Sequence, residues 1–300
     1  MASALTRIVD AHHHLWDLSA NYYPWLTDKV GPRMYGDYAA IRRNYRVDDF
    51  CRDIAALPIV KSVHVQAEHD HEDPVRETRW LQSVADDSGY PHAIVAYADL
   101  SVPEDRLEAV LDAHCACTNL RGVRQMVHEV LVPEMGRSIN LFENVRWQRN
   151  LAALARRSLL FDLQILPPQA KAAFRVAAMH PHLQFVLVHC AQPRDRSDAG
   201  MAAWRAAVEL LSELPNLAIK LSGFGMFERN WTVTSLRPVV YWAIDCFGPD
   251  RVMFGSNFPV DGLMRDYATL WRAYDEITQQ HTDAERDAMF YGTAARLYRI

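Results

Sequence analysis

Long apolar runs are missing from this 300-residue sequence, and their absence limits what the chain can be. No stretch of about 18 apolar residues occurs, so no transmembrane helix and no membrane partner are expected. Residues 1–6 form too short and too polar a start for a secretory signal, which makes the cytoplasm the expected location. No basic block stands out either, since 32 basic and 37 acidic residues give a formal charge of -5, and no nucleic-acid partner is expected.

Cysteine is scarce and shows no pairing pattern. The chain has five cysteines, an odd number, and none of them has CxxC spacing. They are expected to be free thiols in a reducing compartment. Cys190 follows a histidine at the end of an apolar run, where a small core side chain is the favoured interpretation and a nucleophile is the alternative.

Glycine-rich phosphate loops are also missing. The twelve glycines are scattered, and no phosphate-cradling motif follows a predicted strand, which argues against a nucleotide-binding open sheet. The sequence does contain enough apolar residues for a large core, because half of the residues are hydrophobic and 23% are charged. A single globular domain over residues 1–300 is expected, and a barrel of about 250 residues with insertions would fit that length.

Predicted strands and helices alternate along the chain. Apolar runs predict eight strands, the first ending at the histidines after residue 8 and the others at 59–66, 92–100, 120–127, 159–165, 184–189, 217–222 and 251–255. Helical spacing, caps and prolines predict helices at 45–57, 73–88, 101–117, 144–157, 167–179, 200–214, 235–247, 266–279 and 282–297. This alternation specifies a parallel sheet covered by helices, and the count favours a closed (β/α)8 TIM barrel. Residues 17–44 and 128–142 lack a sustained period and are expected to be long loops after the first and fourth strands.

The first predicted strand ends in histidines at alternate positions. His12 and His14 should point the same way, because side chains alternate along a strand. Two imidazoles that converge in this way can hold one metal ion, or can clamp an anionic or carbonyl group without a metal. A tag remnant is the alternative, and the strand-like sequence with Trp16 behind it disfavours a tag.

In a barrel of this kind, catalytic groups project from the C-terminal ends of the strands. The polar residues at those ends are His12, His14, Gln66, Glu68, Arg124, Gln125, Asp162, Gln164, His189, Lys220, Ser222, Asn257 and Asp261, with His128 just beyond the fourth strand. Arg124 suits a substrate carboxylate, and an ion pair with Glu68 is the alternative. Lys220 has no solvated face in a strand, so it either pairs with an acid or faces the pocket. Three aromatic residues would form either a wall of the site or ordinary core: Trp16, Tyr23 and Trp25.

Several short motifs give the sequence a family resemblance. They are Asp-Ala-His-His-His-Leu-Trp at 10–16, Tyr-Pro-Trp-Leu at 23–26, Arg-Gly-Val-Arg-Gln at 121–125, Lys-Leu-Ser-Gly at 220–223 and Phe-Gly-Ser-Asn-Phe-Pro at 254–259. Together they resemble the amidohydrolase-related TIM-barrel hydrolases (amidohydrolase family 2), in the branch of the sugar lactonases and muconolactone hydrolases, such as L-fuconolactonases and L-rhamnonolactonases. The resemblance spans nearly the whole chain.

This resemblance implies an amidohydrolase-like barrel in which His12, His14 and His189 surround a reacting carbonyl. Some relatives bind one divalent metal there, and others work without one. The resemblance is therefore compatible with one divalent metal ion in this chain, zinc or manganese, and with metal-free operation. The family usually places its general-base aspartate where this chain has Asn257. An amide cannot accept a proton near neutral pH, although its oxygen can orient water or bind a metal. The remaining candidates for the base are a metal hydroxide, a histidine, Glu68 and Asp261.

The expected function is therefore that of a hydrolase, a lactonase that opens a small carboxylated or sugar-derived lactone in carbohydrate or aromatic catabolism. The alternatives are a metal-assisted decarboxylase of an aromatic acid and a non-catalytic binding protein on a degenerate barrel. The expected catalytic residues are His12, His14, His189 and Asn257, and the three histidines are the expected ligands if a metal is bound. The expected substrate-binding residues are Gln66, Glu68, Arg124, Gln164, Trp25 and Lys220. The expected partner is a small molecule, and a homo-oligomer is compatible with the sequence.

Overall fold

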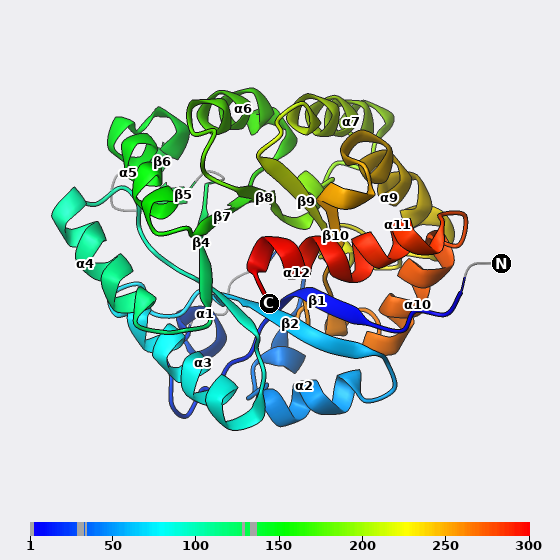
Figure 1. Cartoon of the computed structure of the whole chain (residues 1–300), viewed down its shortest axis with the longest axis horizontal. Coiled ribbons are helices and arrows are strands. Elements are labelled where there is room, and N and C mark those ends of the chain that lie inside the picture. Colours follow the sequence, from blue (N-terminus) through cyan, green and yellow to red (C-terminus); the bar gives the residue numbers. More distant parts are fainter. Residues whose placement is uncertain (1–2, 29–32, 34, 128–129, 133–136) are drawn as a thin grey trace.

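Eight parallel strands form the centre of the molecule (Figure 1). The structure, a computed structural model, describes residues 3–28, 33, 35–127, 130–132 and 137–300. Around the sheet the strands follow one another in chain order: β1 Ile8–His13, β2 Ile59–Val65, β3 Ala93–Ala96, β4 Leu120–Met126, β7 Leu160–Gln164, β8 Phe185–Leu187, β9 Leu217–Leu221 and β10 Val252–Phe254. The predicted (β/α)8 barrel is confirmed.

The barrel closes where the chain after β10 meets β1. The backbone N–H of His14 donates to the carbonyl of Phe258 at 2.7 Å, and that of Asn257 donates to the carbonyl of His12 at 2.6 Å. Gly255 permits this close approach, because a Cβ at that position would lie 2.7 Å from the Cβ of His12. The first and last strands of the barrel therefore bring His12 and Asn257 side by side.

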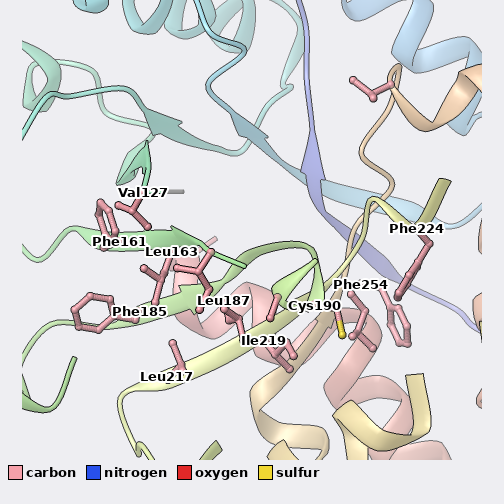
Figure 2. Close-up of a cluster of buried hydrophobic side chains, with 14 of the residues drawn as sticks. Val127, Phe161, Leu163, Phe185, Leu187, Cys190, Leu217, Ile219, Phe224 and Phe254 are labelled. Atoms are coloured by element: carbon pink, nitrogen blue, oxygen red, sulfur yellow. The ribbon is translucent and has the colours of Figure 1, made fainter. Parts of the chain in front are cut away.

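Side chains alternate between the two faces of the strands. Leu187 and Ile219 belong to the apolar layer between the barrel and its helices (Figure 2), whereas Val186 and Ala218 belong to the apolar cluster inside the barrel. Cys190 lies in the outer layer and is fully buried. Burial raises the pKa of its thiol, so the geometry favours a core side chain over a nucleophile at this position.

Helices surround the barrel (Figure 1). The longer ones are α2 Val47–Ile54, α3 Pro74–Ser88, α4 Glu104–Cys115, α5 Val145–Arg156, α6 Ala170–Met179, α7 Asp198–Ser212, α9 Val233–Phe247 and α10 Tyr267–Ile277. The short ones are α1 Pro24–Thr27, α8 Phe224–Phe227, α11 Asp283–Asp287 and α12 Thr293–Tyr298, with single turns at Ala39–Ile41, Leu141–Glu143, Pro167–Gln169, Val188–Ala191, Pro249–Arg251, Asp261–Leu263 and Ala288–Gly292. In α12, Ala294 and Tyr298 pack against the apolar cluster inside the barrel, so this helix closes the end at which the strands begin. None of the helices in the described ranges is long and apolar enough to cross a membrane.

The predicted boundaries differ from the structure in a few places. The long loops predicted after the first and fourth strands contain short elements: α1 and a 3-10 turn in the segment 17–44, and an antiparallel pair, β5 Val130–Val132 with β6 Arg137–Ile139, in the segment 128–142. The strand predicted at 92–100 ends at Ala96, and shortly afterwards the Asp99 carboxylate accepts the backbone N–H of Ser101 at 2.8 Å in a turn. Pro32, His128, Pro133 and Gly136 lie outside the described residues.

Candidate active site

A pocket of about 240 Å³ opens at the C-terminal ends of the strands. Of the residues predicted for the site, the structure brings seven together in its lining: His14, Trp25, Glu68, Arg124, Gln164, His189 and Asn257. His12, Gln66 and Lys220 are fully buried and do not line the pocket. The predicted residues thus separate into a group that a ligand can touch and a group that supports it.

Three histidines meet at the base of the pocket. The ring centroids of His12 and His14 are 5.0 Å apart, and those of His12 and His189 are 4.5 Å apart. Burial, together with the neighbouring positive charges, lowers the pKa of all three, in the case of His14 to about 3. They are therefore neutral at physiological pH and present lone pairs and N–H groups rather than charge.

His14 has a fixed tautomer and a free lone pair. Its Nδ1 lies 2.6 Å from the carbonyl oxygen of Val65, which can only accept, so the ring proton is on Nδ1. Nε2 then carries a lone pair, and it lies 3.3 Å from Oδ1 of Asn257. Two acceptors face each other at this distance without a proton between them, so they can share one donor molecule.

A buried carboxylate lies behind Asn257. The Nδ2 amide of Asn257 donates to Oδ1 of Asp261 at 2.9 Å, and the backbone N–H of Gly225 donates to Oδ2 at 3.2 Å. The first of these bonds turns the amide so that its oxygen faces His14. Burial raises the pKa of Asp261 to about 7, against the opposing effect of these hydrogen bonds. Asp261 does not line the pocket, so it acts on the site through Asn257.

Arg124 is a buried guanidinium that lacks an acidic partner in the described part of the chain. It is 3% exposed, donates from Nη1 to Oε1 of Gln164 at 3.2 Å and from Nη2 to the backbone carbonyl of Gln66, and forms no ion pair with the described residues. Glu68 instead accepts from the Gln66 amide at 2.6 Å and pairs with His71 at 3.4 Å. Burial opposes ionisation of Glu68, but the His71 hydrogen bond and the Arg124 charge lower its pKa to about 2. The geometry favours substrate binding by Arg124 over the alternative of a direct ion pair with Glu68.

Lys220 adopts the paired arrangement rather than the pocket-facing one. Its Nζ donates to Oδ2 of Asp162 and to the hydroxyl of Tyr298, each at 2.8 Å, and both charged side chains are fully buried. The Tyr298 hydroxyl in turn donates to Oδ1 of Asp162 at 3.0 Å. Because its donors are engaged beneath the histidines, Lys220 supports the floor of the site and is not available to a substrate.

The chain after β8 has an unusual backbone. His189, Cys190, Ala191 and Gln192 have φ angles of 53°, 53°, 55° and 50°, all in the left-handed region. This turn places His189 in the pocket, where its Nδ1 lies 2.9 Å from the hydroxyl of Ser222. The strand predicted at 184–189 therefore ends at Leu187, because left-handed residues cannot continue a strand.

Only one of the three aromatic residues considered for the pocket wall lines the pocket. Trp25 does so, and its indole N–H donates to the carbonyl of Ala67 at 2.8 Å. Trp16 and Tyr23 are fully buried in the core. Sequence spacing cannot distinguish a residue of the pocket wall from a residue of the core, because these two environments are both apolar and lie next to each other.

Eight pocket residues were not predicted: Arg33, Tyr35, Ala67, Met126, Gln192, Arg194, Met226 and Val260. Most lie in loops whose path depends on tertiary contacts. A signal was available for Gln192 and Arg194, because they closely follow the predicted site residue His189 at a strand end.

The histidine cluster has only some of the features of a metal site. Neither ring nitrogen of the buried His12 has a hydrogen-bond partner among the described residues, and the free lone pair of His14 is a suitable donor. Nevertheless, no three His, Cys, Asp or Glu residues in the described ranges are grouped closely enough to hold a metal ion. The donor types are therefore those of a metal site, but their placement is not.

Comparisons with known proteins agree with this fold. The family model described as amidohydrolase matches residues 9–300. The uncharacterized protein y4mH of Sinorhizobium fredii is 41% identical over 98% of both chains, and an L-fucono-1,5-lactonase of Burkholderia multivorans is 30% identical over 97% of this chain and 96% of that one. A crystal structure of an amidohydrolase from Burkholderia multivorans with bound zinc covers 98% of this chain and 99% of that one, at a TM-score of 0.81 and 27% identity.

Proposed function

Because the chain belongs to the amidohydrolase family, whose model matches it from residue 9 to residue 300, we propose that it is a lactonase that hydrolyses a small carboxylated or sugar-derived lactone. The observation that carries this proposal is the pair of facing acceptors, His14 Nε2 and Asn257 Oδ1, 3.3 Å apart. A water molecule can donate one hydrogen to each of them. Its oxygen lone pairs are then directed away from both and toward a bound carbonyl.

The other pocket residues complete the reaction. Arg124 binds the carboxylate of an acidic lactone through two charge-assisted hydrogen bonds. Nδ1 of His189 lies 2.9 Å from the Ser222 hydroxyl. In the tautomer that accepts this hydroxyl at Nδ1, the Nε2 proton of His189 donates to the carbonyl oxygen as negative charge develops there. As water attacks, its proton passes to Nε2 of His14. Because the pKa of His14 is low, the imidazolium is a strong donor and returns that proton to the leaving ring oxygen as the ring opens.

In this scheme Asn257 orients water and does not act as the base. That role fits an amide, which accepts a hydrogen bond but cannot accept a proton near neutral pH. Zinc, bound in a related structure, would lower the pKa of a bound water if the three histidines held it. No step above depends on a metal.

Asn257→Leu tests the proposal, because leucine keeps the branching at Cγ and removes the acceptor. We expect kcat for lactone opening to fall by about 10² or more, with KM within about threefold, since the substrate contacts remain. Turnover would be followed by acid release on a panel of aldonolactones and carboxylated lactones. A wild-type protein that opens none of them, or an Asn257→Leu variant with unchanged kcat, contradicts the proposal.

A further inference from the structure

Positive charge gathers in the pocket, although the whole chain carries a formal charge of -5. The described lining contains three arginines, Arg33, Arg124 and Arg194, and one carboxylate, Glu68, which leaves an excess of two positive charges. None of the three arginines forms an ion pair with a residue in the described ranges. A cleft of one sign within a protein of the opposite sign concentrates anions.

A second feature of the pocket lies at the end of the left-handed turn after β8. The guanidinium of Arg194 donates to Oε1 of Gln192 from Nε, at 3.0 Å, and from Nη2. The backbone also brings the two residues together, since the N–H of Arg194 donates to the carbonyl of Gln192 at 2.7 Å. Both side chains line the pocket.

Gln192 is left with an unused donor. Its side chain is fully buried, its oxygen is occupied by Arg194, and its Nε2 has no hydrogen-bond partner among the described residues. A buried N–H group without a partner costs about 1–3 kcal/mol. A fixed amide donor next to a fixed guanidinium is complementary to a carboxylate, which offers two acceptor oxygens.

This feature is separate from Arg124. Arg124 belongs to β4 and Gln192 follows β8, and β7 lies between these two strands in the sheet. His189, the proposed donor to the carbonyl, begins the turn that ends at Gln192. The pocket therefore offers anion-binding groups at two places, with the proposed reaction centre close to the second.

We propose that Gln192 and Arg194 form a second carboxylate subsite and that the substrate is a lactone bearing two carboxylates. This inference rests on the proposed lactonase function and narrows its substrate class. A neutral sugar lactone would leave the guanidinium groups of Arg124 and Arg194 and the Gln192 amide without an anion. The one carboxylate of the described lining, Glu68, already accepts from Gln66 and pairs with His71.

Binding of two unreactive probes tests the subsite. Isophthalate carries two carboxylates on a ring, and benzoate carries one; their dissociation constants would be measured by calorimetry on the full-length protein. Isophthalate should bind about tenfold tighter than benzoate, equivalent to about 1.4 kcal/mol. Arg194→Gln should remove this preference and leave benzoate binding within about twofold, whereas Arg124→Gln should weaken both probes.

The matched control is Arg205→Gln, which removes the same charge from an exposed position on α7 and should leave both dissociation constants unchanged. Equal affinity for the two probes, or an equal loss of both in Arg194→Gln, overturns the subsite. Turnover distinguishes this failure from failure of the function. Hydrolysis of neutral lactones without preference for dicarboxylated ones refutes only the subsite, and isophthalate selectivity in a protein that opens no lactone refutes only the lactonase.

Discussion

Asp261→Asn should abolish the dependence of turnover on pH between about 6 and 8. In the ionised state, Asp261 accepts from the Nδ2 amide of Asn257 and keeps the amide oxygen facing His14. A protonated Asp261 can instead donate to that oxygen. The side-chain amide of Asn257 then flips, and its Nδ2 donates to Nε2 of His14. The Nδ2 group would thereby occupy the proposed position of the attacking water.

The size of this effect follows from the burial of Asp261. Burial raises its pKa to about 7, so activity requires the ionised form and declines as the pH falls through 7. At pH 6 about one tenth of the carboxyl groups are ionised, and kcat should be about a tenth of its plateau value.

The raised pKa also has a consequence for folding. The ordinary pKa of an aspartate, which Asp261 has in the unfolded chain, is 3.8, and its pKa in the folded protein is about 7, so the folded state binds more protons between these values. The stabilising contribution of Asp261 to the free energy of unfolding is therefore complete below about pH 4 and is lost as the pH rises through 7. The shift corresponds to about 4 kcal/mol, so Asp261→Asn should lower the free energy of unfolding less at pH 8 than at pH 5.

The assay is a pH profile of kcat on a lactone that the wild-type protein opens, with the free energy of unfolding measured in urea at each pH. Glu77→Gln is the matched control, because Glu77 is also buried with a pKa raised to about 7 but does not touch Asn257. It should keep the wild-type profile. If Asp261→Asn still loses activity between pH 8 and 6, another group controls the reaction and the amide-orientation mechanism is refuted.

Three further predictions concern other parts of the site. Asn257→Asp places a second carboxyl group 2.9 Å from Asp261, so the two should share a proton, and lactone turnover at pH 7 should not exceed that of the wild type; a large gain would indicate a decayed site. Dialysis against EDTA should leave turnover unchanged, because no three His, Cys, Asp or Glu residues of the described chain are grouped closely enough to hold a metal. The prediction would be contradicted if dialysis abolished the activity and added zinc restored it in the wild-type protein but not in His12→Ala. Lys220→Met leaves the buried Asp162 without its ion-pair partner, so urea denaturation should show a free energy of unfolding lower by about 3–5 kcal/mol. The double variant Lys220→Met with Asp162→Leu should recover most of this loss. Equal stabilities of the single and double variants would argue against a stabilising ion pair.

The sequence predicted the barrel well because its signals are local. The apolar runs at Val63 and Leu163 and the proline before Val75 each determine an element without reference to distant residues. Strand ends were predicted less well where tertiary contacts decide them. β8 ends at Leu187 because the chain enters a left-handed turn, and no residue of that turn is a glycine that would have indicated it.

The sequence predicted which residues belong to the candidate site, but not which of them line the pocket or which side chains contact each other. Alternation placed His12 and His14 on one side of the sheet, but only the structure shows that His14 reaches the pocket while His12 lies beneath it. The place of Lys220 depended on Asp162, 58 residues away, and on Tyr298. Pairings over such distances cannot be read from spacing.

The junction of β1 with the chain after β10 has a consequence for how the protein is made. His14 and Asn257 are 243 positions apart, and their contact forms only where the barrel closes. During translation β1 therefore emerges from the ribosome long before the chain after β10 has been synthesised. The edge of β1 that pairs with that segment stays unpaired during most of translation. Shortened chains that end before Asn257 should lack the proposed water position altogether, so the proposed reaction would become available to the nascent protein only when the barrel is nearly complete.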